Sequence, residues 1–276
     1  MELERVLVVG AGQMGSGIAQ VVAASGRTVA LHDPYPGATD RALESMRRSL
    51  AKLAEKGGPD PDQALARVTV VDDLVAADVM IEAVVEDAAV KEELFRRADS
   101  ALPPQAILAS NTSSIPIASL AAATARPDRV IGMHFFNPVP VLGLVEVIRA
   151  ATTSDATNEA IVSLARALGK EPVEVRDVAG FVSNRILMPF LNEAVYALAE
   201  GVADAEGIDT VAKLGFAHPL GPLALADLIG LDTCVSIMEV LERGLGDARY
   251  APHPLLREYV AAGRLGRKSG RGFYDY

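Results

Sequence analysis

A glycine-rich turn near the N-terminus is the feature that most constrains this fold. Gly10-Ala11-Gly12-Gln13-Met14-Gly15 follows the apolar run 6–9 and precedes a helix-compatible stretch over residues 18–24. In such a strand–turn–helix unit, the first glycine permits the tight turn and the second lets the backbone approach a pyrophosphate. The third lets the helix pack on the strand, and the N–H groups at the helix start attract phosphate. Residues 10–15 are therefore predicted to bind a dinucleotide.

An acidic residue stands where the ribose of that dinucleotide is expected. Asp33 follows the apolar segment 28–32 and lies 23 residues beyond Gly10. A carboxylate at this spacing hydrogen-bonds the adenosine ribose and repels a 2′-phosphate. No arginine directly follows Asp33, so the sequence favours NAD over NADP. The alternative is that Asp33 simply caps a turn before Pro34.

Short apolar segments alternate with helical patterns through the first two thirds of the chain. Such alternation predicts a doubly wound α/β domain with a parallel sheet. Residues 185–245 instead carry long apolar-periodic stretches with almost no strand signal. We predict a Rossmann-type domain over residues 1–178 and an all-helical domain over residues 179–276. Strands are expected at 6–9, 28–32, 68–70, 79–81, 107–109, 130–133, 144–148 and 173–175, and helices at 18–24, 38–56 and 91–98.

Composition narrows the partners and the compartment. The 276 residues carry a net charge of −10, which argues against a nucleic-acid partner. No apolar run reaches the roughly 18 residues of a membrane helix, and no signal segment opens the sequence. Cys234 is the one cysteine, which fits a reducing compartment and is expected in the core. The four histidines show no ligand spacing, so we expect no metal site. From the lack of a membrane helix and of a signal segment, we expect a cytoplasmic protein without a membrane partner.

Three polar segments lie on or just past predicted strands: 110–114, 134–138 and 144–148. Ligands of open parallel sheets sit beyond the carboxyl ends of the strands, so a hydroxyl, an imidazole and a carboxylate are expected to converge there. Oxidation of an alcohol by hydride transfer needs a base, and an imidazole exchanges protons near neutral pH. Glu146 interrupts an apolar strand and needs a partner, for which His134 is the candidate. Taken singly, such residues are more often structural.

Together these segments resemble the short-chain L-3-hydroxyacyl-CoA dehydrogenases, including bacterial 3-hydroxybutyryl-CoA dehydrogenases. The resemblance covers nearly the whole chain and is most specific in the pairing of His134-Phe135-Phe136-Asn137-Pro138 with Gly180-Phe181-Val182-Ser183-Asn184-Arg185. Further matching segments are Val84-Val85-Glu86, Ser110 to Ser114, Leu144 to Ile148, His218-Pro219-Leu220-Gly221-Pro222 and Gly270-Arg271-Gly272-Phe273-Tyr274.

The resemblance implies a role for each matching position. His134 matches the catalytic base, Glu146 its paired acid, Ser113 the serine that hydrogen-bonds the substrate oxygen, and Asn184 the asparagine that positions the substrate. Ser49 and Lys56 fall where the family contacts coenzyme A, although both are equally well explained as surface residues and Lys52 is an alternative. Positions that match the nicotinamide cofactor site are Glu86, Lys91, Asn111, Asn137 and Lys268.

The implied activity is NAD-dependent oxidation of a short-chain L-3-hydroxyacyl-CoA, such as 3-hydroxybutyryl-CoA, and its reverse. The substrate is expected between the two domains, and the helical domain is expected to form a homodimer. Alternatives are a related dehydrogenase for 3-hydroxyadipyl-CoA or a sugar acid, and a non-catalytic NAD-binding protein. Fatty-acid degradation by β-oxidation, butanoate synthesis and aromatic catabolism all remain open as pathways.

Overall fold

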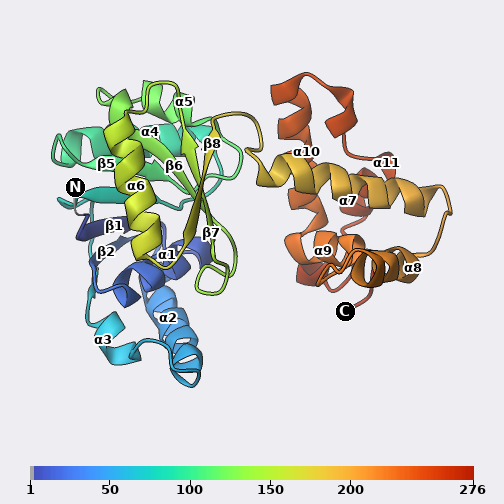
Figure 1. The fold of residues 1–276 in the computed structure, drawn as a ribbon, viewed down its shortest axis with the longest axis horizontal. Coiled ribbons are helices and arrows are strands. Elements are labelled where there is room, and N and C mark those ends of the chain that lie inside the picture. Colours follow the sequence, from blue (N-terminus) through green and yellow to red (C-terminus); the bar gives the residue numbers. More distant parts are fainter. Residues whose placement is uncertain (1–2) are drawn as a thin grey trace. The chain divides into compact units, whose positions relative to one another are not determined.

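The computed structural model describes residues 3–276, and the chain divides into two compact units, with the boundary along the chain between Asp177 and Val178 (Figure 1). The first unit contains a mixed sheet and its covering helices. Its strands are β1 (Arg5–Val9), β2 (Thr28–His32), β3 (Val68–Val70), β4 (Val79–Glu82), β5 (Ile107–Ser110), β6 (Val130–Phe135), β7 (Leu144–Arg149) and β8 (Glu171–Arg176). Its α-helices are α1 (Gln13–Ala24), α2 (Ala38–Ala54), α3 (Pro61–Leu65), α4 (Ala88–Ala101), α5 (Ile117–Ala122) and α6 (Asp155–Ala167).

The sheet has the order β3-β2-β1-β4-β5-β6-β7-β8. All neighbouring strands run parallel except β6 and β7, which pair antiparallel. The link between β6 and β7, residues 136–143, contains no helix, and a parallel crossover usually needs one. The predicted doubly wound fold is therefore confirmed, with one antiparallel pair that the alternation of elements did not indicate.

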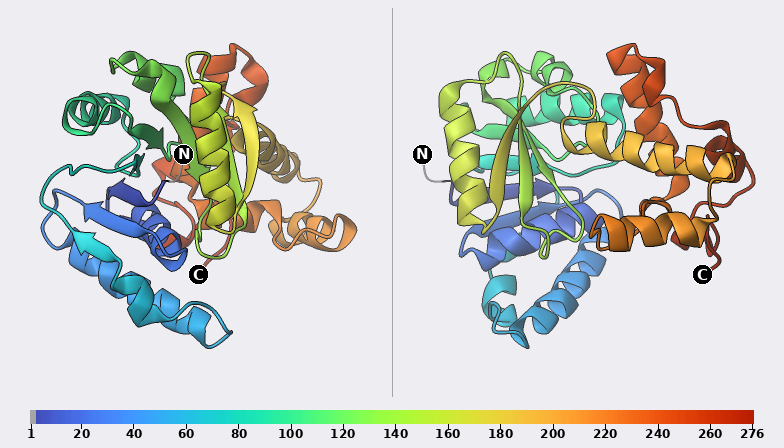
Figure 2. Two further views of the ribbon diagram at one scale, coloured as in Figure 1. Left: turned by 60° about the vertical axis from the view of Figure 1, so that its left-hand side comes forward. Right: turned by 45° about the vertical axis from the view of Figure 1, so that its right-hand side comes forward.

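Helices cover both faces of this sheet, as the two views in Figure 2 show for α1 and α6 against α4 and α5. Alternate strand residues point to opposite faces, so Val6 and Val8 join the core beneath α1 while Leu7 points the other way. Both sets are buried because both faces are covered. This explains why β1 is a continuous apolar run rather than an alternating one.

Two boundaries that differ from expectation are a helix start and a strand end. Helix α4 begins at Ala88 rather than at Lys91, because the Asp87 carboxylate accepts a hydrogen bond from the backbone N–H of Val90 and caps the first turn. Strand β4 extends one residue further than predicted and ends at Glu82, whose side chain is fully buried. Both differences lie beside the candidate site described below.

The second unit is helical. It contains α7 (Ser183–Ala199), α8 (Ala205–Thr210), the π-helical turn η2 (Val211–Gly215), α9 (Pro222–Ile229), α10 (Leu231–Leu245) and α11 (Pro254–Ala261). Cys234 lies in its core, as expected, and burial raises the pKa of this thiol to about 12. The buried Asp227 carboxylate accepts the backbone N–H groups of Phe273 and Tyr274 and so fastens the last residues to α9. Within residues 3–276, no helix combines the length and apolarity that a membrane span requires.

Candidate functional site

The glycine turn has the geometry that its spacing predicted. Gly10 has a φ of +99°, and a Cβ there would lie 2.5 Å from the carbonyl oxygen of Ala83. A Cβ on Gly15 would lie 1.7 Å from the Gly10 carbonyl oxygen, so α1 packs against the turn only without a side chain at that position. Gly12 instead faces open space and precedes α1 without a side-chain cap. A phosphate group therefore has room to approach the helix N-terminus.

Asp33 holds two backbone segments together. Its Oδ2 accepts a hydrogen bond from the N–H of Ala11 at 2.7 Å, and its Oδ1 accepts one from the N–H of Tyr35 at 2.9 Å. The second bond is the turn-capping role raised as the alternative reading. The first bond joins Asp33 to the glycine turn, so the carboxylate lies beside the predicted pyrophosphate cradle. An open turn at Gly12, a helix N-terminus and an adjacent carboxylate together fit a bound dinucleotide.

His134 and Glu146 form a buried pair across two strands. They lie directly opposite each other in the antiparallel register of β6 and β7. Nδ1 of His134 is 2.9 Å from Oε2 of Glu146, and the two residues are 8% and 2% exposed. The ring of Phe136 packs on the imidazole with centroids 4.6 Å apart. The partner that sequence reasoning assigned to Glu146 is the one that the structure supplies.

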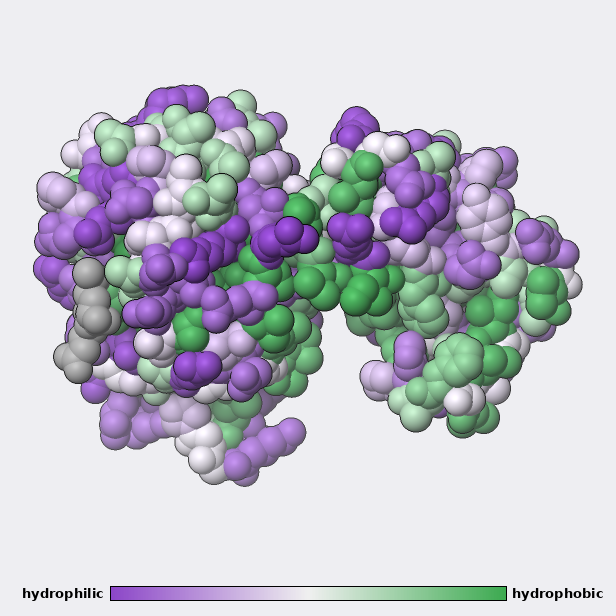
Figure 3. Space-filling model, turned by 45° about the horizontal axis from the view of Figure 1, so that its top comes forward, coloured by the Kyte–Doolittle hydropathy of each residue, from purple (hydrophilic) through white to green (hydrophobic). Residues whose placement is uncertain are grey.

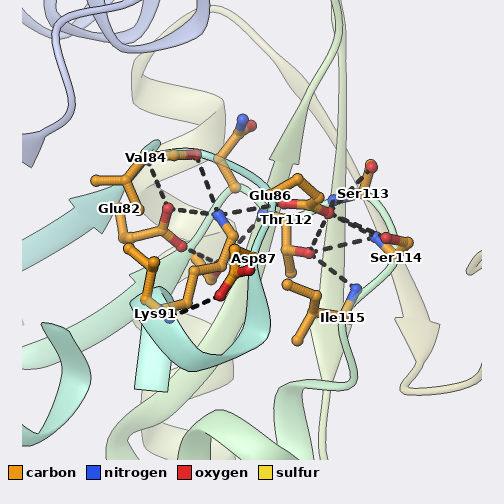
Figure 4. Close-up of polar contacts among 12 residues, drawn as sticks. Glu82, Val84, Glu86, Asp87, Lys91, Thr112, Ser113, Ser114 and Ile115 are labelled. Carbon is orange, nitrogen blue, oxygen red and sulfur yellow. Dashed lines mark hydrogen bonds and ion pairs between the residues drawn. The ribbon is translucent and has the colours of Figure 1, made fainter. Parts of the chain in front are cut away.

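Glu86 gathers the loop after β5 around one carboxylate oxygen, as Figure 4 shows. Its Oε1 accepts hydrogen bonds from the Thr112 hydroxyl at 2.6 Å and from the N–H and hydroxyl of Ser113 at 2.8 and 3.1 Å. The N–H and hydroxyl of Ser114 add two more. Burial alone would raise the pKa of Glu86, but Lys91 and these donors outweigh it and lower the pKa. Two residues predicted for different tasks, Glu86 and Ser113, are therefore in direct contact.

A second buried carboxylate, Glu82, was missed by sequence reasoning. Its Oε1 lies 2.5 Å from the ammonium of Lys91, which is itself 1% exposed and pairs with Glu86 at 3.2 Å. Burial raises the pKa of Glu82, with the Lys91 charge acting against the shift. The available signal was an acid directly after an apolar strand, because a buried charge requires a partner. Lys91 is thus enclosed between two carboxylates rather than exposed.

Two asparagines join the ends of neighbouring elements. The Asn111 side-chain oxygen accepts a hydrogen bond from the N–H of Phe135 at 2.8 Å and so ties the end of β5 to β6. The Asn137 side-chain oxygen accepts one from Nε2 of Gln13 at 3.1 Å, which links the loop after β6 to the start of α1. Met14 packs against the core beneath α1. The glycine turn, Asn111 and Asn137 therefore lie along one edge of the sheet.

The remaining predicted site residues lie elsewhere. Ser49 is half-buried on α2, and Lys56 is exposed just past the end of that helix. Asn184 and Lys268 belong to the second unit, where Asn184 lies in the first turn of α7 with an exposed fraction of 8%. The Lys268 ammonium pairs with Asp232 at 2.6 Å. Among residues 3–276, no three histidine, cysteine or acidic side chains are grouped so that they could hold a metal ion.

A doubly wound sheet with a glycine turn and a buried histidine–carboxylate pair at its edge defines a dinucleotide-dependent oxidoreductase. Comparison with family models specifies the class further. Residues 5–178 match the model for the 3-hydroxyacyl-CoA dehydrogenase NAD-binding domain, and residues 180–276 match the model for the C-terminal domain of the same family. The chain belongs to the 3-hydroxyacyl-CoA dehydrogenase family, is an NAD-dependent oxidoreductase, and its cofactor is NAD.

Individual relatives match over nearly their full length. A probable 3-hydroxybutyryl-CoA dehydrogenase of Bacillus subtilis is 55% identical over all of this chain and 98% of its own length. The crystal structure of (S)-3-hydroxybutyryl-CoA dehydrogenase from Ralstonia eutropha has a TM-score of 0.96 at 48% identity and covers 100% and 99% of the two chains. A diketoreductase of known structure is more distant, with a TM-score of 0.85 at 32% identity and full coverage of both chains.

Proposed function

We propose that this enzyme oxidises the 3-hydroxyl of short-chain L-3-hydroxyacyl-CoA thioesters, with 3-hydroxybutyryl-CoA as the favoured substrate, and catalyses the reverse reduction. The observation that carries the proposal is the buried contact between His134 Nδ1 and Glu146 Oε2 at 2.9 Å. A base is what oxidation of an alcohol requires from the protein. The substrate name comes from the names of similar proteins.

His134 acts as the base. Because Nδ1 faces Glu146, the proton exchanged with the substrate hydroxyl passes through Nε2. The Glu146 carboxylate orients the ring and stabilises the imidazolium that forms, as in other histidine–carboxylate pairs. Bound NAD supplies the acceptor for the hydride that leaves C3. In the reduction, His134 returns its proton to the carbonyl oxygen.

Ser113 and Asn184 hold the reacting end of the substrate. The Ser113 hydroxyl donates to Glu86 in this structure and would turn toward the substrate oxygen in the complex. Asn184, at the start of α7, would position the thioester from the second unit. We infer that the first unit binds the cofactor and that the second unit contributes to substrate binding and dimerisation.

The cofactor is held along the sheet edge. Residues 10–15 receive the pyrophosphate at the N-terminus of α1, and Asp33 receives the adenosine ribose. An apolar pocket beside Asp33, lined by Val9, Pro34 and Val90, suits the adenine ring. Toward the nicotinamide end, the proposed contacts are Glu86, Lys91, Asn111, Asn137 and Lys268.

Coenzyme A is proposed to contact α2. The Lys56 ammonium is exposed just past the end of α2 and suits a phosphate oxygen, and Ser49, seven residues earlier on α2, adds a hydroxyl.

A cytoplasmic location and a homodimer complete the proposal. The dimer is supported by large exposed apolar side chains in the second unit, including Leu214, Val202 and Ile186. Figure 3 shows apolar surface on the face of that unit that is in view.

A dehydrogenase for another 3-hydroxy substrate is the main rival. The diketoreductase shows that this fold is compatible with a substrate of a different kind. A 3-hydroxyadipyl thioester would require a cation at the far end of the acyl pocket. A comparison of turnover with 3-hydroxybutyryl-CoA, 3-hydroxyadipyl-CoA and a 3-hydroxy sugar acid separates these possibilities, because the preferred substrate has the highest kcat/KM.

The direct test is NADH consumption with acetoacetyl-CoA by the purified protein and by His134→Gln. We expect the wild type to consume NADH and the variant to lose roughly 10²–10⁴-fold in kcat, because general acid–base catalysis contributes that much. NADH affinity, measured by fluorescence titration, should stay unchanged. His253→Asn serves as the control, since His253 caps α11 and asparagine can make the same cap.

Two results would count against the proposal. Wild-type protein that binds NADH but leaves every acyl-CoA unreacted would favour a non-catalytic NAD-binding role. Near-normal turnover by His134→Gln would leave the dehydrogenase activity in place and remove His134 from the role of base.

A further inference from the structure

Glu82 lies behind the proposed site and has no access to a ligand. Its side chain is fully buried at the end of β4, beside Ser110 at the end of β5 in the parallel register. Neither the substrate nor the cofactor can contact a carboxylate in this position. Its two oxygens nevertheless lead, by separate routes, to the loop that follows β5, residues 110–114.

The first route passes through Ser110. The Ser110 hydroxyl donates to Oε2 of Glu82 at 2.6 Å and accepts the N–H of Thr112 at 3.1 Å. The backbone also contributes, because the N–H of Asn111 donates to the Glu82 carbonyl at 2.8 Å. Glu82 therefore fixes the first half of the loop.

The second route passes through Lys91. The Lys91 ammonium lies 2.5 Å from Oε1 of Glu82 and 3.2 Å from Glu86, so it bridges the two carboxylates. Glu86 in turn accepts five hydrogen bonds from Thr112, Ser113 and Ser114, including the Ser113 hydroxyl. The second half of the loop is thus held through the same buried carboxylate (Figure 4).

The contacts of Glu82 fit an ionised carboxylate. Lys91 and the N–H of Val84 both donate to Oε1, Lys91 supplies the counter-charge, and the Ser110 hydroxyl lies on Oε2. An ionised Glu82 also compensates the positive charge of Lys91, so that Glu86 can accept the hydrogen bonds of the loop. Without Glu82, the buried ammonium would have Glu86 as its one remaining counter-charge among these groups and would draw it away from Ser113.

We propose that Glu82 is a positioning residue that fixes the loop 110–114 through Ser110 and through the Lys91–Glu86 bridge, and so sets the Ser113 hydroxyl for the reaction. The inference rests on the proposed role of Ser113 in binding the substrate oxygen. It assigns a functional reason to a buried charge pair that would otherwise serve stability alone, although such pairs are often no more stabilising than apolar residues.

A double-mutant cycle between Glu82→Gln and Ser113→Ala tests this coupling. In acetoacetyl-CoA reduction, we expect Glu82→Gln to lower kcat/KM about tenfold and Ser113→Ala to lower it more. The double variant should fall no more than about twofold below Ser113→Ala, because residues that act through one contact are not additive. Glu92→Gln, one residue along α4 from Lys91 and paired with the exposed Arg96, is the matched control and should retain wild-type activity.

Hydrogen exchange of residues 110–114 gives a readout that needs no substrate. We expect faster exchange in Glu82→Gln than in the wild type and in Glu92→Gln. If the wild type reduces no acyl-CoA, the proposed function fails, and this exchange experiment still decides whether Glu82 fixes the loop. Unchanged exchange in Glu82→Gln, or losses that multiply with those of Ser113→Ala, would overturn the inference.

The variant Glu82→Gln/Lys91→Met guards against a folding defect. Removing both buried charges should restore much of the thermal stability lost when one partner is removed. We expect loop exchange to stay fast in this variant, and exchange is the readout because Lys91 is also a proposed cofactor contact. Recovery of wild-type exchange together with stability would show that the pair serves folding only, and the inference would be wrong.

Discussion

At the residue scale, one cross-strand pair accounts for the proposed chemistry. Residues directly opposite in an antiparallel ladder have neighbouring side chains, and His134 and Glu146 occupy such a position. The short link between β6 and β7 therefore has a chemical consequence, since a parallel β7 would not place these two residues in the same register. Glu146, at 2% exposed, obtains a partner without leaving its apolar strand.

The carboxylate of this pair should influence the pH dependence of turnover. In Glu146→Gln, the imidazolium of His134 loses its ionic partner and becomes less stable. We expect oxidation to slow by roughly 10–100-fold, and the acidic limb of the kcat/KM profile to move to lower pH. Steady-state rates across a pH series measure both effects. Glu171→Gln, an exposed carboxylate on β8, is the control; an unchanged profile in Glu146→Gln would exclude Glu146 from the site.

At the scale of elements, the loop between β6 and β7 is held by a buried lysine. The Lys170 ammonium donates to the carbonyl oxygens of Val139 and Leu142 at 2.5 and 2.7 Å, and burial lowers its pKa. The same loop carries Asn137, and Val139 packs closely over Gly17 of α1. Lys170 thus joins the start of β8 to a segment proposed to contact the cofactor.

Lys170→Met should therefore loosen this loop more than it destabilises the whole fold. It removes two hydrogen bonds from a charged donor but also a buried charge, so we expect a net loss of about 1–2 kcal/mol in the free energy of unfolding. Hydrogen exchange of residues 136–143 should accelerate, with a several-fold weaker NADH affinity. Denaturant unfolding, exchange and NADH titration are compared with those of Lys213→Met, an exposed lysine. Unaltered exchange in the loop would contradict the assignment.

At the scale of the whole molecule, the first unit was more predictable than the second. Alternating strand and helix patterns indicated the sheet, and lack of strand signal indicated a helical unit, but no pattern specified how α7 to α11 pack. The exposed apolar side chains of the second unit, with Leu214 at 82% and Val202 at 72%, exceed what its own core requires. Large apolar side chains left exposed in this way support the proposal of a protein interface on this unit.

Sedimentation velocity at micromolar concentration should therefore show a species of twice the 29.0 kDa mass of one chain. Leu214→Glu should shift the population toward monomer, because a charge buried in an apolar interface is costly. Val70→Glu, on the exposed strand β3 of the first unit, should leave the mass unchanged. A wild-type monomer at this concentration would rule out the proposed homodimer.

The sequence alone determined the features that depend on local pattern. The glycine turn, the strand that precedes it and the acid at the end of β2 follow from residue spacing, because sterics and backbone geometry act between close neighbours. The acid within an apolar strand also indicated the pairing of His134 with Glu146. Family resemblance added roles for Ser113, Asn184 and the further cofactor positions, and the catalytic roles stay predictions.

Apart from the His134–Glu146 pair, tertiary structure decided which side chains of the candidate site meet. Glu82, Lys91 and Ser110 come from β4, α4 and β5, and no spacing rule connects them. Strand order and register bring them together, and each buried charge is stabilised by an ionic or hydrogen-bonding partner. The antiparallel pairing of β6 and β7 was likewise decided by the tertiary structure. The link between them, residues 136–143, contains no crossover helix, so β7 runs back along β6.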